Sequence, residues 1–169
     1  MSKRRALFLD RDGTINIDKH YVYRIEDFEW VPGIVELCRA AVGAGYDIVI
    51  ITNQSGIERG YFTEADYELF TAYLKEQFAA HGVPVLDVLH CPWLEHEDRK
   101  PNPGLFLKAA AKWSIDMAAS LSLGDKERDV QAGKNAGVGR NYLLSAGGSS
   151  ALATAVVANP QEMIPFLTE

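Results

Sequence analysis

Residues 6–14 read ALFLDRDGT, a short apolar run that ends abruptly in two aspartates, Asp10 and Asp12. Four consecutive apolar residues bounded by charge and glycine are typical of a strand that is buried on both faces of a parallel sheet. Such a strand delivers Asp10 to the loop that follows it. Because a solvated turn rarely follows so apolar a strand, the two acids are candidates for a chemical role.

Working outward from this strand, the chain alternates between strand and helix patterns. The β-branched run 48–51 predicts a second buried strand within residues 46–52. Further strands are expected at 85–90, 121–123 and 141–144, and helices between Pro32 and Gly45, from the cap Thr63 to about His81, at 104–112 and at 130–136. This alternation predicts an α/β fold with a doubly wound parallel sheet that has helices on both faces.

In folds of this kind, ligands bind beyond the carboxyl ends of the strands. Asp10, Thr52, residues 91–100 and Asp125 all follow predicted strands. We therefore expect these residues to gather at one edge of the sheet.

The remaining segments complete a single predicted domain, residues 1–169. Residues 154–157 form a weak strand candidate, and Asn159-Pro160 predicts the start of a last short helix. The loops 16–31 and 91–102 are too short to contain a cap domain. We therefore expect a capless, open site, which either admits a large substrate or relies on a small one whose distal groups complete the enclosure.

Composition and charge limit the classes of ligand that the protein is expected to bind. The chain is 47% hydrophobic and 24% charged, as in an ordinary globular protein. Its formal net charge is -6, and the longest basic cluster is Lys3-Arg4-Arg5, which argues against a nucleic-acid surface. A phosphorylated substrate stays possible, since a bound metal and a few placed cations can invert the local potential.

The same residues predict a reducing compartment and no membrane span. Cys38 and Cys91 lie far apart without a paired spacing, which does not indicate a disulfide framework. The basic opening 1–5 is followed by only four apolar residues, so we interpret it as leading into a strand rather than an export signal. No apolar run approaches the roughly 20 residues of a membrane helix. We expect a cytoplasmic monomer that binds a small phosphorylated metabolite.

Asp10 and Asp12 point to phosphoryl transfer. A carboxylate can attack phosphorus, but two anions repel, so the reaction needs a divalent cation that bridges Asp10 and the phosphate. Asp12 can then protonate the leaving oxygen and later activate water. The alternative is a surface turn with two solvated acids.

Residues 10–14 resemble the first motif of the haloacid dehalogenase-like (HAD) phosphatases, and the other motifs of that family follow in order. Thr52 matches the threonine that binds the transferring phosphoryl group, and Lys100 matches the lysine that neutralises the nucleophile and the phosphate. The resemblance implies a Rossmann-like fold, catalysis by Asp10, Asp12, Thr52 and Lys100, and Mg²⁺ held by Asp10, Asp12 and Asp125.

Thr52 and Lys100 each have a simpler alternative interpretation, and Asp129 has two interpretations. The Thr52 segment can be an Asx-type turn after a strand, and Lys100-Pro101 alone can be an ordinary loop. Asp129 either orients the waters of the metal or favours the start of the following helix.

The resemblance extends to a subfamily and covers nearly the whole chain. Residues 10–21, 52–57, 59–63 and 116–120 look like the D-glycero-D-manno-heptose-1,7-bisphosphate phosphatases, which are close relatives of histidinol-phosphate phosphatases. Arg99 is notable because a planar guanidinium can grip a second phosphate or sugar hydroxyls; a solvated arginine is the alternative. The resemblance implies substrate contacts from Asp18, Lys19, His20, Tyr21, Asn53, Gln54, Ser55, Arg99 and Lys126.

The sequence departs from this subfamily in residues 91–98. Many members carry a structural zinc loop there, with three cysteines and a histidine. This segment is shorter and has one cysteine, with Cys91, His96 and Asp98 as the permitted zinc ligands. Because a closed structural site usually needs four good ligands, we favour a metal-free loop packed by Trp93 over a structural zinc.

The favoured function is therefore Mg²⁺-dependent hydrolysis of a phosphomonoester through an aspartyl-phosphate on Asp10. The subfamily implies loss of the C7 phosphate from the heptose bisphosphate, with histidinol phosphate as the alternative substrate. A non-catalytic phospho-receiver places its aspartate after the third strand, whereas Asp10 follows the first. A binding module derived from a phosphatase has no use for Asp12 as an acid and base.

Overall fold

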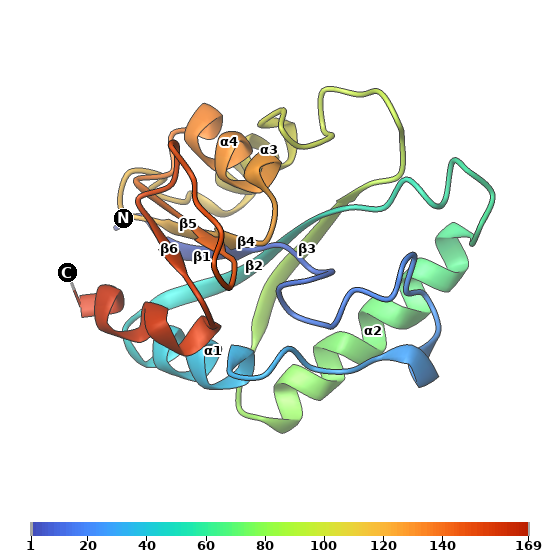
Figure 1. Ribbon diagram of the computed structural model, residues 1–169, viewed down its shortest axis with the longest axis horizontal. Helices are drawn as coiled ribbons and strands as arrows, with labels where there is room; N and C mark the ends of the chain where they lie inside the picture. Colours follow the sequence, from blue (N-terminus) through green and yellow to red (C-terminus); the bar gives the residue numbers. More distant parts are fainter. Residues whose placement is uncertain (1, 169) are drawn as a thin grey trace.

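The computed structural model describes residues 2–168 and shows an α/β domain built on one six-stranded sheet (Figure 1). The strands are all parallel, in the order β3-β2-β1-β4-β5-β6. They are β1 (Arg5–Leu9), β2 (Tyr46–Asn53), β3 (Val85–Cys91), β4 (Leu121–Gly124), β5 (Arg140–Leu144) and β6 (Ala155–Val157). The predicted doubly wound parallel sheet is confirmed.

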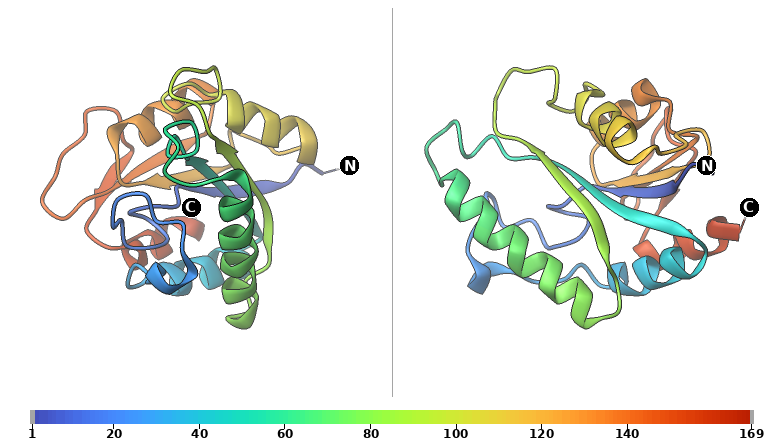
Figure 2. Two further views of the ribbon diagram at one scale, coloured as in Figure 1. Left: turned by 90° about the vertical axis from the view of Figure 1, so that its right-hand side faces the viewer. Right: turned by 180° about the vertical axis from the view of Figure 1, so that it is seen from behind.

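Four α-helices cover the two faces of the sheet (Figures 1 and 2). They are α1 (Ile34–Gly43), α2 (Glu64–Ala80), α3 (Gly104–Trp113) and α4 (Glu127–Ala136). Successive side chains of a strand point to opposite faces. Leu7 and Leu9 of β1 thus pack in one core with α1 and α2, while Ala6 and Phe8 pack in the other with α3 and α4. Both faces of β1 are apolar because both are covered.

The capping residue predicted for α2 is found in the structure, and two short helices differ from what the sequence predicted. Thr63 caps α2 through a capping box with Asp66, as its position predicts. The last helix, η2 (Pro160–Thr168), is a 3₁₀ helix rather than an α-helix. It contains Pro165, which lacks the N–H that an α-helical bond needs. A short 3₁₀ turn, η1 (Ile25–Asp27), was not predicted.

The longest helix within residues 2–168 is α2, with 17 residues. None of the helices in this part of the chain combines the length and the apolar content that a bilayer span requires.

The topology fixes where a ligand can bind. From the central strand β1 the sheet extends to β2 on one side and to β4 on the other. At such a switch point the loops after the strands diverge and leave a crevice at the carboxyl edge. Asp10 lies directly after β1 and Asp125 directly after β4, so both acids come to this crevice.

Candidate active site

A pocket of about 320 Å³ lies at this edge of the sheet. Its walls are formed by residues that the sequence predicted for the site, together with two arginines that it did not, Arg59 and Arg128. The lining residues are Asp10, Asp12, Asp18, His20, Tyr21, Asn53, Gln54, Ser55, Arg59, Arg99, Lys100, Asp125, Lys126 and Arg128. The predicted gathering at the carboxyl edge is confirmed, while the roles of the single residues stay predictions.

Two predicted site residues lie outside this lining. Thr52 is 1% exposed; its hydroxyl accepts a hydrogen bond from Gln54 at 2.9 Å and donates to the carbonyl of Asn53 at 3.4 Å. Lys19 instead forms an exposed ion pair with Glu29, at 3.4 Å. Thr52 therefore supports the floor of the pocket, and Lys19 points elsewhere.

Lys100 joins the carboxylates at the floor of the pocket. Its Nζ lies 2.8 Å from Oδ1 of Asp10 and 2.7 Å from Oδ1 of Asp129, and it donates to the carbonyl of Ile51 at 2.7 Å. Burial by itself would lower the pKa of Lys100, but Asp10 and Asp129 outweigh it and raise the pKa. The lysine is therefore a fully charged, fully engaged cation at neutral pH.

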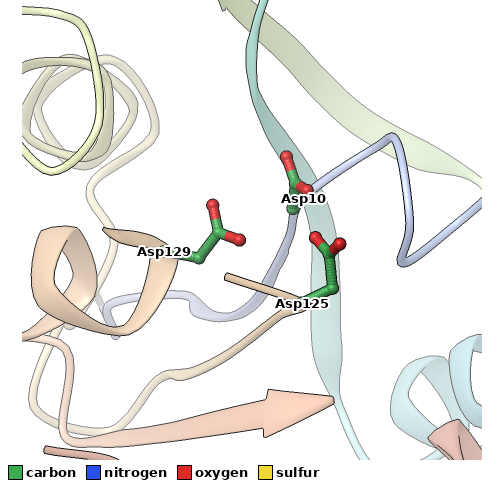
Figure 3. Close-up of side chains that lie close together, drawn as sticks. All are labelled: Asp10, Asp125 and Asp129. Atoms are coloured by element: carbon green, nitrogen blue, oxygen red, sulfur yellow. The ribbon is translucent and has the colours of Figure 1, made fainter. Parts of the chain in front are cut away.

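Asp10, Asp125 and Asp129 form a cluster in which single carboxylate oxygens lie within 4.8 Å of one another (Figure 3). Burial first, and then the charge of Asp129, hold the pKa of Asp10 well above its ordinary value. Burial also raises the pKa of Asp125. Lys100 pairs with Asp10 and Asp129 but not with Asp125, so the three carboxylates keep excess negative charge in a partly buried place, which is unfavourable unless a further cation neutralises it.

The cluster fits a divalent cation. Oδ1 of Asp125 is buried and has no hydrogen-bond partner within the described residues. A buried carboxylate oxygen without a donor is costly, and coordination to a metal ion satisfies it. Mg²⁺ prefers oxygen ligands, so Asp10, Asp125 and Asp129 could hold it.

Gly13 provides the space for this arrangement. A Cβ atom at Gly13 would lie 2.2 Å from Oδ2 of Asp125 and 2.6 Å from its Cγ. The residue also has φ +88°, in the left-handed region that favours glycine. Only glycine lets the loop after β1 approach the Asp125 carboxylate so closely.

Asp12, the third predicted metal ligand, does not belong to the carboxylate cluster. Its Oδ1 accepts hydrogen bonds from Arg11 at 3.1 Å and from Asn16 at 3.0 Å, and its Oδ2 accepts from Gln54 at 3.0 Å. The Arg11 side chain is itself 1% exposed and donates to the carbonyl of Val22. Three donors therefore hold the Asp12 carboxylate on the wall of the pocket, beside the cluster rather than inside it.

Asp129 is the third member of the carboxylate cluster, beside Asp10 and Asp125. Its Oδ2 accepts a hydrogen bond at 3.0 Å from the backbone N–H of Lys126, the N-cap residue that precedes α4. Its Oδ1 meets Lys100 in the cluster. The contact with Lys126 agrees with the interpretation that Asp129 favours the helix start, and a role in orienting the waters of a metal stays a prediction. The position of Asp129 four residues after Asp125 was the only local signal.

The rim of the pocket carries four cations, and among the described residues only Lys126 has a carboxylate close by. Arg59 and Arg128 make no ion pair within residues 2–168, and Arg99 only approaches the carbonyl of Trp93, at 3.5 Å. Lys126 lies 3.6 Å from Asp125. In a chain of net charge -6, so many free cations around one pocket favour an anionic ligand.

The three residues weighed as zinc ligands have protein partners. Cys91 is buried, and its Sγ donates to the carbonyl of Trp93. Nδ1 of His96 accepts from the backbone N–H of Asp98 at 3.0 Å, and the Asp98 carboxylate accepts from Lys108. Trp93 packs on His96, with ring centroids 4.3 Å apart.

Comparison with known proteins agrees with this site. Residues 6–140 match the family described as polynucleotide kinase 3 phosphatase. The D-glycero-alpha-D-manno-heptose-1,7-bisphosphate 7-phosphatase of Burkholderia mallei is 46% identical over 179 residues, which cover 98% of this chain and 95% of that protein. The D-glycero-beta-D-manno-heptose-1,7-bisphosphate 7-phosphatase of Helicobacter pylori is 48% identical over 148 residues, which cover 85% and 86%.

A solved structure shares the whole architecture. The D,D-heptose 1,7-bisphosphate phosphatase of B. bronchiseptica, in complex with magnesium and phosphate, matches with a TM-score of 0.87 and 27% identity over 96% of this chain and 97% of that one. The fold and the site thus define a phosphatase of the HAD superfamily. Within it, the chain belongs to the family of the D-glycero-D-manno-heptose-1,7-bisphosphate 7-phosphatases.

The close approach of Gly13 to the Asp125 carboxylate can be tested by substitution. The substitution Gly13→Ala is expected to lower kcat/KM for phosphate release by roughly a hundredfold, because it displaces the Asp125 carboxylate by an ångström or more. The matched control is Gly82→Ala, at φ +77° with open space around its Cβ. Both substitutions carry the same backbone strain, of roughly 1–2 kcal/mol. Equal losses of activity in the two variants would contradict the importance of the contact.

Proposed function

We propose that the protein is a Mg²⁺-dependent phosphatase that removes the C7 phosphate of D-glycero-D-manno-heptose 1,7-bisphosphate through an aspartyl-phosphate on Asp10. The observation that carries the proposal is the cluster of Asp10, Asp125 and Asp129, in which Lys100 pairs with Asp10 and Asp129 and an Asp125 oxygen has no partner. The named relatives from Burkholderia mallei and Helicobacter pylori support the substrate.

Asp10 is the proposed nucleophile. Its hydrogen bond to Lys100 orients the carboxylate at the floor of the pocket, where one oxygen attacks phosphorus while the bond between phosphorus and the C7 oxygen breaks. Asp12 donates a proton to the leaving oxygen. In the second half of the reaction Asp12 takes a proton from water, which attacks the aspartyl-phosphate and releases inorganic phosphate.

The surrounding residues hold these two acids in place. Arg11, Asn16 and Gln54 fix the Asp12 carboxylate, and Gln54 also binds the hydroxyl of Thr52. We propose that Thr52 and Lys100 bind the phosphoryl oxygens. A Mg²⁺ ion held by Asp10, Asp125 and Asp129 would neutralise the negative charge that nucleophile and phosphate bring together. The B. bronchiseptica neighbour, in complex with magnesium and phosphate, supports the choice of metal.

The cationic rim supports a substrate with a second phosphate. Arg99 and Lys126, with Arg59 and Arg128, surround the mouth of an open pocket. A second phosphate on the substrate gives the three arginines an anionic partner that the described residues do not supply. The two named relatives differ in the anomer, so the proposal covers both anomers. Two unpaired cysteines fit a reducing cytoplasm, which is the proposed location.

The test is phosphate release from a panel of esters with Mg²⁺ and with EDTA. The panel contains both anomers of heptose 1,7-bisphosphate, histidinol phosphate and, because of the matching family, an oligonucleotide with a 3′-phosphate. We expect kcat/KM for a heptose bisphosphate to exceed that for the other esters by at least about a hundredfold, and EDTA to abolish it. A preference for histidinol phosphate or for the oligonucleotide would contradict the proposed substrate.

A further inference from the structure

Arg99 lies in the loop between β3 and α3 and lines the pocket. The backbone of the next residue, Lys100, is held by hydrogen bonds to the sheet. The backbone N–H of Lys100 donates to the side-chain oxygen of Asn53 at 3.0 Å, and the Asn53 amide donates back to the carbonyl of Lys100 at 3.2 Å. Asn53 ends β2, which is part of the sheet. The chain on the C-terminal side of Arg99 is thereby tied to the sheet.

The preceding residue, Asp98, is a buried acid that follows a mostly exposed stretch, residues 93–97. It is 3% exposed, and its Oδ2 accepts a charge-assisted hydrogen bond from Nζ of Lys108 on α3. Nδ1 of His96 lies 3.6 Å from Oδ2 of Asp98, but its hydrogen bond goes to the backbone of Asp98 and not to the carboxylate. Nδ1 of His96 accepts from the backbone N–H of Asp98, so this nitrogen carries no proton to donate to the carboxylate. Lys108 therefore provides the compensating charge.

The carboxylate also packs tightly against the start of α3. A Cβ atom at Gly104 would lie 2.4 Å from Oδ1 of Asp98 and 2.5 Å from the carbonyl oxygen of Glu97. Gly104, the first residue of α3, thus allows the loop to lie directly on the helix, where the positive end of the helix dipole favours an anion. Oδ1 has no hydrogen-bond partner within the described residues, which leaves Lys108 as the strong contact of this side chain.

We propose that Asp98 is a positioning residue: the ion pair of its buried carboxylate with Lys108 fastens the loop 92–99 to α3 and thereby holds the Arg99 guanidinium at the pocket. The proposal rests on the proposed function, in which Arg99 binds the distal phosphate of the substrate. Loss of Lys108 leaves a buried carboxylate without its charged partner, and this is far more costly than loss of a surface pair. The loop then has to move to expose Asp98, and Arg99 moves with it.

The kinetic test compares Lys108→Met with Lys112→Met, two changes on the same helix. The side chains of Lys108 and Lys112 are 54% and 60% exposed, and each pairs with an aspartate, but Lys112 pairs with Asp87, far from the loop. We expect Lys108→Met to raise KM for heptose 1,7-bisphosphate about tenfold, with kcat changed less than about twofold. KM for p-nitrophenyl phosphate, which has no distal anion, stays unchanged. Lys112→Met is expected to change the KM of neither substrate. Lys108→Arg, which keeps the positive charge, is expected to keep the wild-type KM.

A double-mutant cycle with Arg99→Ala tests whether Asp98 acts through Arg99. If it does, Lys108→Met has no further effect on KM in the Arg99→Ala background. A tenfold rise that persists without Arg99, or an equal rise for both substrates, would overturn the proposal.

A measurement without substrate separates this proposal from the proposed function. Trypsin can cut after Arg99 only when the loop opens, so Lys108→Met is expected to speed this cleavage severalfold over the wild type and over Lys112→Met. Unchanged cleavage would overturn the positioning role even if heptose bisphosphate is the substrate. Failure of wild type to hydrolyse heptose bisphosphate, combined with faster cleavage in Lys108→Met, would refute the substrate and keep the anchoring of the loop.

Discussion

The variant Asp10→Asn is expected to lose phosphatase activity, with kcat lower by at least about 10⁴-fold. An amide oxygen is a poor nucleophile toward phosphorus, and the substitution also removes one of the three carboxylates of the cluster. Asparagine has nearly the same size and shape as aspartate, so the variant should remain folded. The measurement is phosphate release under saturating substrate and Mg²⁺, with circular dichroism as the check on folding.

The matched control is Asp47→Asn, the same chemical change at the beginning of β2. Asp47 pairs with Arg4 at the surface, at 3.1 Å, and we expect its variant to keep full activity. The covalent step can be seen directly. Borohydride reduction of the acid-quenched wild type during turnover should convert Asp10 to homoserine, which mass spectrometry detects. Full activity of Asp10→Asn, or homoserine at another position, would refute Asp10 as the nucleophile.

The variant Asp125→Asn should be more stable than wild type without metal, and it should no longer respond to Mg²⁺. The folded-state pKa of Asp125 is raised above its ordinary value of 3.8 by burial, so the ionised form is disfavoured in the folded protein. The destabilisation is absent well below pH 3.8, where both states are protonated, grows as the pH rises from 3.8 to the raised pKa, and is complete above the raised pKa. Asparagine removes it.

We expect thermal unfolding in EDTA at pH 7 to occur roughly 2–4 °C higher in Asp125→Asn, the effect of about 1 kcal/mol in a domain of this length. Lowering the pH should shrink this difference. Saturating Mg²⁺ should stabilise wild type and leave the variant unchanged, because binding to the folded state alone raises stability. The control Glu127→Gln neutralises an exposed acid two residues away and should keep the Mg²⁺ response. A Mg²⁺ response in Asp125→Asn equal to that of wild type would place the metal elsewhere.

Much of the fold was predictable because its determinants are local. The run Leu7-Phe8-Leu9 has apolar side chains on both sides, and an extended chain can bury both only between two layers of helices. The cap Thr63 and the terminal Gly45 mark helix ends by their own backbone and side-chain chemistry. Once the strands were placed, the rule for parallel sheets brought Asp10, Lys100 and Asp125 to one edge.

The partners of each side chain were harder to predict. The family resemblance implied Asp12 as a metal ligand, and in the structure Arg11, Asn16 and Gln54 hold its carboxylate outside the cluster. Asp129 joins Asp10 instead, across a distance of more than a hundred residues in the chain. Arg59 and Arg128 gave no local signal that distinguishes a pocket arginine from a solvated one.

The sequence by itself determined the class of fold, the edge of the sheet at which the site lies and the acids that can perform the chemistry. It did so because hydrophobic periodicity and turn chemistry depend on neighbours in the chain. Only the tertiary structure decided which acids lie together beside Lys100, which arginines line the pocket and what fastens the loop of Arg99. Those properties depend on distances between residues of different elements, such as Lys100 to Asp129 or Asp98 to Lys108, and on burial, which makes an unpaired charge costly.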